Sequence, residues 1–288
     1  MQQTVEACHT YTIGEALYSR GSAWGYRARD EQLEDWVILE FVSTLEDTAE
    51  RREFLIQYRS IAVKVMRLRH PNVVAIRDFV VHRDQFFVVK QYDSGVTLDA
   101  LLSGSTNVDL QPRDRESLCK DILRGLAALH QSNIIHRDLK SSGVYVKDQP
   151  ELLAQIDYFH LAVSAETEYL DSNLCGTPAY MAPELINPPH LFSKQSDVYA
   201  AGLLLLEVLT GSSIQDLMQL EGFEGGSLLS YVVSRGGHIS ERLIRQSVTP
   251  QYADLLACAT RTNPSGRFAD CQAFYESFAL NVPLRIFS

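Results

Sequence analysis

Apolar residues in the first 95 positions follow mostly the short periods of β-strands. Four strand-like runs, rich in β-branched and aromatic residues and bounded by polar segments, lie at 26–29, 36–42, 73–81 and 85–92. Residues 45–70 change to a helical period, with Tyr58, Ile61 and Val65 on one apolar face. This helix is expected to end before Pro71, because proline disfavours helix in the residue that precedes it.

From about residue 95 the pattern becomes mainly helical. Helical periods cover 98–102, 115–131, 194–210 and 250–260, and short strand-like pieces lie at 144–147 and 152–158. The predicted fold class is therefore α+β in two lobes, within one domain spanning 1–288. We expect a small β-rich N-terminal lobe with one helix at about 11–92, a hinge at about 91–95, and a larger, mainly helical lobe at about 96–280.

Composition and charge narrow the function classes. The chain has 288 residues, 45% hydrophobic and 22% charged, which is typical of a globular protein. Its formal charge of -10 disfavours a nucleic acid partner. The longest apolar run, 199–206, is too short to span a bilayer, so no membrane insertion is expected. Five scattered cysteines without a CxxC pair, and an N-terminus without signal-peptide features, predict a reducing, cytoplasmic location.

Several sequence marks follow one another in the second lobe. They are His136-Arg137-Asp138-Leu139-Lys140, Tyr158-Phe159-His160, GTPAYMAPE from Gly176 to Glu184, Asp197-Val198-Tyr199, and Arg267-Phe268. In this order and spacing they resemble the Hanks-type protein kinase family, close to its serine/threonine branch. The resemblance extends from about Tyr11 to Phe278 and implies the two-lobed protein kinase-like fold.

The resemblance also implies which residues support the fold. His136 and Phe159, with Val65, match the hydrophobic spine of the family, and Asp197 matches the helix aspartate that bonds the HRD backbone. Glu184 and Arg267 match a buried ion pair of the C-terminal lobe. Asp138 is the retained catalytic base of the family, with Lys140 beside it. Because the neighbouring scaffold residues are kept, we interpret Asp138 as structural.

Kinases hold magnesium and a nucleoside triphosphate and orient the acceptor hydroxyl, and this chain departs from the family at several of those positions. Glu40 stands where the phosphate-binding lysine is expected, and the first lysine of the chain is Lys64. Ile61 stands in place of the helix glutamate. One hypothesis pairs Glu40 with Lys64 or Arg59, and the alternative leaves these charges solvated on the polar face of the helix.

The metal-binding positions of the family hold Gly143 and Tyr158, and neither offers the anionic oxygen that magnesium prefers, so no metal is expected. A register shifted by one residue would instead place Asp157 at the second position. The glycine-rich loop aligns with 18–25, where Tyr18, Arg20 and Ala23 replace the three glycines.

The nucleotide pocket of the family aligns with larger or more polar side chains than usual. These residues are Ile38, Lys90, Tyr92 and Tyr145. We expect a filled or narrowed pocket, because close packing tolerates little overlap with an adenine ring. Lys90 has two alternatives, pointing toward the phosphates or meeting Glu40.

Two regions are candidates for contact with another protein. The activation segment contains the hydroxyls of Thr167, Tyr169, Ser172 and Thr177, and a phosphate on one of them would suit Arg137. The region 211–249 has apolar residues between glycines, which fit either a contact surface or ordinary core.

Taken together, the departures favour a catalytically inactive kinase homologue, a pseudokinase that is not an enzyme. It would act in signalling as a scaffold, by binding another protein of unknown identity. No cofactor is expected, and nucleotide binding is expected to be weak or lost. Two alternatives stay open: an atypical serine/threonine kinase with residual phosphotransfer through Asp138, and a switch that binds ATP without magnesium.

Overall fold

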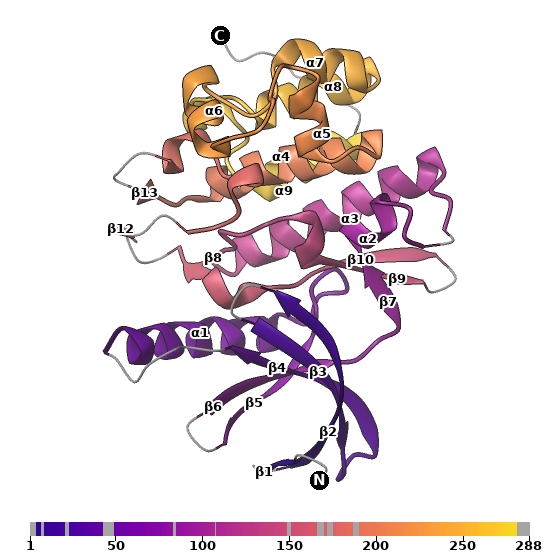
Figure 1. Ribbon diagram of the computed structural model, residues 1–288, viewed down its shortest axis with the longest axis vertical. Coiled ribbons are helices and arrows are strands. Elements are labelled where there is room, and N and C mark those ends of the chain that lie inside the picture. The colour runs from indigo at the N-terminus through magenta and orange to yellow at the C-terminus, as the bar shows by residue number, and fades with distance from the viewer. Residues whose placement is uncertain are drawn as a thin grey trace. The chain divides into compact units, whose positions relative to one another are not determined.

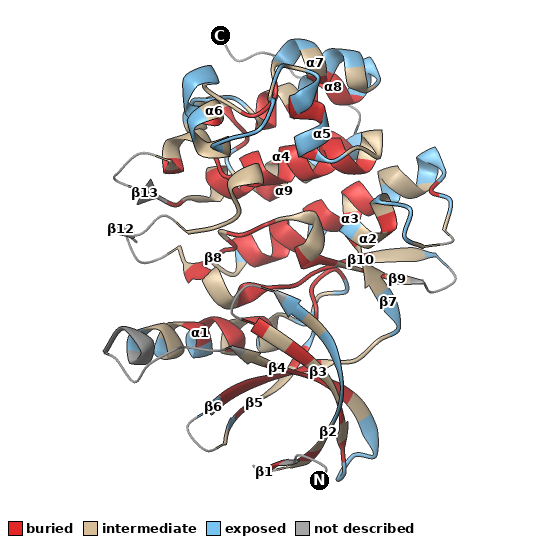
Figure 2. Ribbon diagram, in the orientation of Figure 1, coloured by how far each residue is buried: buried red, intermediate tan, exposed pale blue. Residues whose placement is uncertain are grey.

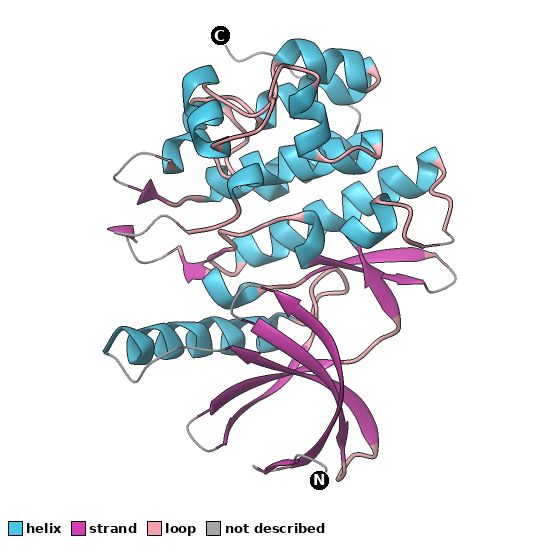
Figure 3. Ribbon diagram, viewed as in Figure 1, coloured by secondary structure: helices cyan, strands magenta, loops and turns pink. Residues whose placement is uncertain are grey.

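The computed structural model describes residues 4–6, 9–20, 23–42, 49–82, 85–106, 108–148, 151–165, 170–171, 175–186 and 190–280. The chain divides into an N-terminal unit, Met1–Ser94, and a C-terminal unit, Gly95–Ser288 (Figure 1). The first is an antiparallel sheet with a helix, and the second is mainly helical (Figure 3). The predicted α+β class, with a β-rich N-terminal lobe and a helical C-terminal lobe, is confirmed.

A six-stranded antiparallel sheet forms the N-terminal unit, in the order β1-β2-β3-β4-β6-β5. Its strands are β1 (Thr4–Glu6), β2 (Thr10–Arg20), β3 (Ala23–Asp30), β4 (Asp35–Val42), β5 (Ile76–His82) and β6 (Gln85–Gln91). β4 lies between β3 and β6, and Val37 and Leu39 on one of its faces pack into the core with Tyr11, Val80 and Val89. Alternation along β4 turns Ile38 and Glu40 to the other face.

The helix of this unit, α1 (Ala49–Leu68), buries the face predicted from its period. Tyr58, Ile61, Ala62 and Val65 are buried, and the Tyr58 ring packs on Phe86 of β6 at a centroid distance of 5.6 Å. These residues recur every three or four positions, which is the spacing of one side of a helix. The helix therefore brings Tyr58 close to the strands that hold the polar residues described below.

Helices dominate the C-terminal unit. They are α2 (Leu98–Leu102), α3 (Pro112–Gln131), α4 (Lys194–Thr210), α5 (Ile214–Gln219), α6 (Leu228–Arg235), α7 (Glu241–Ser247), α8 (Pro250–Ala259) and α9 (Cys271–Leu280). Short strands are β7 (Gly95–Thr97), β8 (Ile134–Ile135), β9 (Val144–Asp148), β10 (Leu152–Ile156), β11 (Val163–Ser164), β12 (Leu170–Asp171) and β13 (His190–Leu191). Single 3₁₀ turns are η1 (Ser141–Gly143), η2 (Phe159–Leu161), η3 (Pro178–Tyr180), η4 (Pro183–Leu185) and η5 (Pro264–Gly266).

The helix α4 is buried on nearly all sides within this unit, as the continuous red colour in Figure 2 indicates. Apart from Glu207, residues 198–208 of this helix are apolar or glycine, so apolar side chains face every direction, which is typical of a helix in the centre of a domain. Ser193 caps its start by accepting a hydrogen bond from the N–H of Ser196, and Gly211 ends it with a φ of 74°. The apolar run 199–206 is therefore part of the core of this unit.

The sequence pattern missed some elements. The strands β1 and β2 were not predicted, because β2 contains a mixed polar sequence with irregular pairing to β3. The predicted strand at 73–81 begins only at Ile76, and the piece at 152–158 ends at Ile156. In the region 211–249 the structure forms α5 to α7. Some of its apolar residues are buried core, including Ile214, Met218 and Val232, whereas Leu220 and Val233 are exposed.

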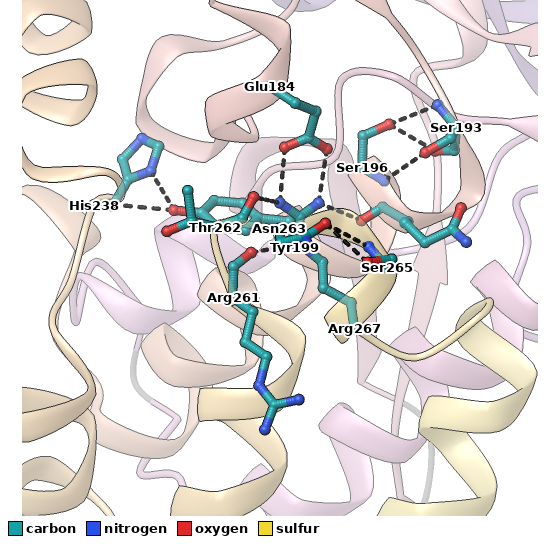
Figure 4. Close-up of polar contacts among 11 residues, drawn as sticks. Glu184, Ser193, Ser196, Tyr199, His238, Arg261, Thr262, Asn263, Ser265 and Arg267 are labelled. Carbon is teal, nitrogen blue, oxygen red and sulfur yellow. Dashed lines mark hydrogen bonds and ion pairs between the residues drawn. The ribbon is translucent and has the colours of Figure 1, made fainter. Parts of the chain in front are cut away.

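An ion pair between Glu184 and Arg267 joins η4 to the segment that precedes α9. Both guanidinium nitrogens donate to the carboxylate at 2.7 Å, as Figure 4 shows, and the Arg267 side chain is fully buried. The same guanidinium also donates to the carbonyls of Arg261, Thr262 and Gln195. Bidentate charged hydrogen bonds of this kind are among the strongest in proteins.

Removing Arg267 is therefore expected to destabilise the C-terminal unit strongly. Arg267→Met leaves the Glu184 carboxylate and several carbonyls without their donor, and we expect a loss of about 3–5 kcal/mol in the free energy of unfolding. Urea denaturation followed by far-UV circular dichroism measures it. The control is Arg245→Met, which removes an exposed pair with Glu241 and Asp254 and should change little. Equal losses in the two variants would contradict the prediction.

Candidate active site

The loop after β8 contains Asp138, and one buried carboxylate holds its backbone. Asp197 of α4 accepts hydrogen bonds from the N–H groups of His136 (2.7 Å) and Arg137 (3.0 Å) and from the ring of His130 (3.0 Å). Burial alone would raise the pKa of Asp197, but the hydrogen bond from His130 and the nearby histidines lower it below its ordinary value. The carboxylate therefore stays ionised and fixes the loop.

Asp138, Lys140 and Thr177 form a closed triangle of polar contacts. The Lys140 ammonium donates to Asp138 Oδ2 at 2.7 Å and to Thr177 Oγ1 at 2.9 Å, and the Thr177 hydroxyl donates to Asp138 Oδ1 at 2.6 Å. The Asp138 residue is 4% exposed. A carboxylate, a hydroxyl and an ammonium thus lie within hydrogen-bond distance of one another. In this arrangement the carboxylate can take a proton from an alcohol, and the ammonium can attract a nearby negative charge.

A second chain of hydrogen bonds connects this loop to α4. The hydroxyls of Ser141 and Tyr180 are 2.9 Å apart, and Tyr180 donates to Glu207 Oε2 at 2.6 Å. The other Glu207 oxygen accepts from the N–H of Ile214 at 2.8 Å. Burial raises the pKa of Glu207 to about 7, so this carboxyl group changes charge near neutral pH. Ser141, Tyr180 and Glu207 were not predicted from the sequence, and the available signal was the position of Tyr180 within the GTPAYMAPE mark.

The residues expected in the hydrophobic spine of this unit lie together. The rings of His136 and Phe159 meet edge to face at 5.7 Å, and both residues are fully buried. The His136 ring also contacts the carbonyl of Asp157 at 2.9 Å. Tyr158, which follows Asp157 in the chain, has left-handed backbone angles, with φ 76° and ψ 55°. The centroid of its ring lies 4.5 Å from the Lys140 ammonium nitrogen.

The two positions at which the family binds magnesium do not fit a metal ion. Gly143 has no side chain, and Tyr158 offers a phenol, whereas magnesium requires hard oxygen ligands, usually carboxylates. Within the described residues there is no group of three or more His, Cys, Asp or Glu side chains placed to hold a metal. In the same part of the chain, no helix is both long and apolar enough to cross a membrane.

In the N-terminal unit, Glu40 is the centre of a buried polar cluster. Its carboxylate accepts from the Lys90 ammonium at 2.8 Å, from the Tyr18 hydroxyl at 2.8 Å and from the Tyr58 hydroxyl at 2.9 Å. The side chains of Glu40 and Lys90 are 1% and 0% exposed. Three donors therefore satisfy the carboxylate that replaces the lysine of the family.

The structure places the Lys90 ammonium against Glu40, which confirms one of the two alternatives given for that lysine. Strand pairing explains this choice, because Ile38 faces Lys90 and Glu40 faces Val88 across β4 and β6, so Glu40 and Lys90 are diagonal neighbours on one face. Ile61 is buried on α1, and the polar residue that α1 directs to Glu40 is Tyr58 instead. The helical period predicted Tyr58 on the buried face of α1, but not the hydrogen bond from its hydroxyl to Glu40.

The residues expected in the nucleotide pocket belong to both units. Ile38 and Lys90 are paired across strands, and Tyr92 lies 5.1 Å from the guanidinium of Arg27, all in the N-terminal unit. Tyr145 lies on β9 of the C-terminal unit. In the segment aligned with the glycine-rich loop, Gly25 belongs to β3, and a Cβ there would overlap the Tyr18 ring.

Much of the activation segment lies outside the described residues, including Thr167 and Ser172 as well as Tyr169. Thr177 is described and bonds Asp138, as given above. Arg137 contacts the ring of Phe192 at 3.9 Å and donates to the Cys175 sulfur.

Comparison with known proteins tests whether this chain belongs to the family that its motifs resemble. The sequence model of the protein kinase domain matches residues 25–278, which is most of the chain. The chain belongs to the protein kinase domain family. The serine/threonine-protein kinase PknL of Mycobacterium tuberculosis is 30% identical over 265 residues, covering 91% of this chain and 63% of PknL. The serine/threonine-protein kinase PrkC of Bacillus subtilis is 26% identical over 280 residues, covering 94% of this chain and 41% of PrkC.

These findings correct the expectation about activity. We expected a pseudokinase that is not an enzyme, but the kinase domain match and the similarity to proteins named as serine/threonine-protein kinases point to an enzyme. The inference failed because it treated each missing family residue as the loss of a function. The alternative of an atypical kinase is compatible with both the comparisons and the residues at positions 40, 143 and 158. The chain spans less than two thirds of the length of PknL and PrkC.

The Glu40 cluster predicts a large effect of Lys90 on the stability of the N-terminal unit. Lys90→Met leaves a buried carboxylate without its cation, and we expect a loss of about 3–5 kcal/mol. The double variant Glu40→Gln, Lys90→Met should recover much of this loss, because it removes both charges. Both tryptophans, Trp24 and Trp36, lie in this unit, so their fluorescence during urea denaturation measures its unfolding.

The matched control is Arg77→Met, which breaks an ion pair with Asp35 of similar length, 2.7 Å, but at the surface. Exposed pairs contribute little, so this variant should unfold near the wild-type midpoint. A Lys90→Met variant as stable as Arg77→Met would contradict the prediction.

The raised pKa of Glu207 predicts a pH-dependent stability. Between its ordinary value of 4.5 and about 7, the folded protein binds more protons at Glu207 than the unfolded chain does. The stability that wild type has relative to Glu207→Gln should therefore fall as the pH rises through this window, by roughly 3 kcal/mol in all. Urea denaturation of both proteins at several pH values measures it, and a constant difference would contradict it.

His238→Gln provides a comparison of opposite sign. Burial lowers the pKa of His238 from 6.5 to about 4, so the unfolded chain binds more protons there in that range. The stability of wild type relative to this variant should rise with pH between about 4 and 6.5. The two variants together separate a specific effect of Glu207 from a general acid effect.

Proposed function

We propose that this chain is an atypical protein serine/threonine kinase domain, which transfers the terminal phosphoryl group of a nucleoside triphosphate to an alcohol of a protein. The observation that carries the proposal is the triangle of Asp138, Lys140 and Thr177 on a loop fixed by Asp197. The similarity to proteins named as serine/threonine-protein kinases supports it.

The geometry suggests how each residue of the triangle contributes. The Asp138 carboxylate accepts a hydrogen bond from the Thr177 hydroxyl at 2.6 Å, so it is placed to accept one from the alcohol of a substrate. As the alcohol oxygen bonds to the γ-phosphorus, the bond from phosphorus to the β,γ-bridging oxygen breaks, the nucleoside diphosphate leaves, and the alcohol proton passes to Asp138. The ammonium of Lys140 lies 2.7 Å from the same carboxylate and is placed to offset negative charge on the transferred group.

The kinase is atypical because a negative side chain of its N-terminal unit stands where the family has a positive one. Glu40 occupies the lysine position, and its cation Lys90 is fully buried against it. We infer that Lys140, on the loop of Asp138, provides the positive charge that meets the phosphoryl group. The protein substrate is left as a class, a serine or threonine hydroxyl, since the chain spans only part of its relatives.

A transfer assay tests the proposal. The chain is incubated with γ-labelled ATP and dephosphorylated casein, in parallel with magnesium, with manganese and with EDTA. Asp138→Asn should lower the transfer rate by about 10²–10⁴-fold, which is the usual contribution of a general base. Asp109→Asn, an exposed aspartate before α3, is the control and should keep the wild-type rate. Transfer that is absent in all three buffers, or that is unaffected by Asp138→Asn, would refute the proposed function.

A further inference from the structure

The side chains around the family's metal positions supply an ammonium and an aromatic ring. Tyr158 occupies one of those positions and is buried, and its ring centroid lies 4.5 Å from Lys140 Nζ. A ring face attracts a cation through its quadrupole, so Tyr158 stabilises the ammonium at this place. Lys140 therefore has a carboxylate, a hydroxyl and a ring around its charged end.

Packing does not require the glycine at the other metal position. A Cβ at residue 143 would lie 3.6 Å from Tyr158 Cβ, 3.7 Å from Lys140 Cγ and 3.8 Å from the Asp157 carbonyl oxygen, all ordinary contacts. The backbone there does not have a positive φ. A Cβ at this position is thus sterically acceptable, so close packing around the Cβ does not explain why the position lacks a side chain with an oxygen ligand.

Charge then decides which form of a nucleoside triphosphate suits the site. The metal-free form carries more negative charge than its magnesium complex, and attraction to a fixed ammonium grows with that charge. The magnesium complex gains its advantage in kinases from hard oxygen ligands, which positions 143 and 158 do not supply. The Asp138 carboxylate is engaged by Lys140 and Thr177.

We propose that this chain takes a metal-free nucleoside triphosphate as its phosphoryl donor, with the Lys140 ammonium, held over the Tyr158 ring, in place of the divalent cation. The inference rests on the proposed kinase function for the transfer step. In that step the alcohol oxygen bonds to the γ-phosphorus and the bond from phosphorus to the β,γ-bridging oxygen breaks. The alcohol proton passes to Asp138, and the nucleoside diphosphate leaves with the electron pair.

The inference is tested by comparing the affinity of the chain for ATP in EDTA with its affinity in excess magnesium chloride. Isothermal titration calorimetry at equal ionic strength measures both. Wild type should bind ATP about tenfold or more tightly in EDTA, a difference of about 1.4 kcal/mol or more. Lys140→Met should abolish this preference, whereas Lys140→Arg, which keeps the charge, should retain it. Lys120→Met, on an α3 lysine paired with Glu116, is the control and should behave like wild type.

Restoring the family ligands should reverse the preference. The double variant Gly143→Asn, Tyr158→Asp supplies two oxygen ligands and removes the ring, so ATP should bind more tightly with magnesium than without it. Tighter binding by wild type in magnesium, or no binding in either buffer, would overturn the inference. Magnesium-dependent binding with transfer that depends on Asp138 would overturn it and leave the proposed function standing. Metal-free binding without any transfer would refute the proposed function and the role of ATP as phosphoryl donor, and would leave only the preference of the Lys140 site for the metal-free form.

Discussion

The conformation of the loop that contains Asp138 depends on the hydrogen bonds that the Asp197 carboxylate accepts. This carboxylate extends from the central helix α4 and accepts hydrogen bonds from two successive backbone N–H groups of the loop. Arg137 in that loop has a φ of 69°, a conformation that costs free energy for a residue other than glycine. The hydrogen bonds to Asp197 compensate for this cost, and the side chain of Asp138 is positioned as a result.

The two units solve the problem of a buried charge in different ways. In the C-terminal unit, Asp197 is held by backbone N–H groups and a histidine, and Glu184 by a fully buried arginine. In the N-terminal unit, Glu40 is held by a lysine and two tyrosine hydroxyls. A buried carboxylate needs such donors because burial without them is costly. Only the second arrangement departs from the pattern of the kinase family, and it lies at the position where that family has its lysine.

Much of the fold could be predicted from the sequence, because its helices carry clear periods and its motifs have a fixed order. The helices at 98–102 and 194–210 have the predicted bounds, and α1 buries Tyr58, Ile61 and Val65 as expected. The strand β2 and the helices α5 to α7 were not predicted, since mixed sequences such as theirs form structure through tertiary contacts.

For the candidate site, local motifs indicated Asp138, Lys140 and Asp197, whereas residues joined by long-range contacts were harder to find. Tyr58 reaches Glu40 because α1 packs beside β6. Glu207 reaches Tyr180 because α4 packs against the turn η3. The sequence offered Lys90 as one of several cations for Glu40, and the pairing of β4 with β6 selected it. The expectation of an inactive protein was wrong for another reason. Departures from the family at single positions, such as 40, 143 and 158, do not by themselves show that the rate of catalysis is lost.

The diagonal contact of Glu40 with Lys90 also has a consequence for how the sheet assembles. Since side chains alternate along a strand, sliding β6 past β4 by one residue would turn Lys90 to the opposite face and bring it among Val37 and Leu39. Such a misaligned sheet would contain two separated charges in an apolar interior. The pair therefore favours the native register of β4 and β6, because a misregistered pairing would bury the two charges apart from each other while the chain folds.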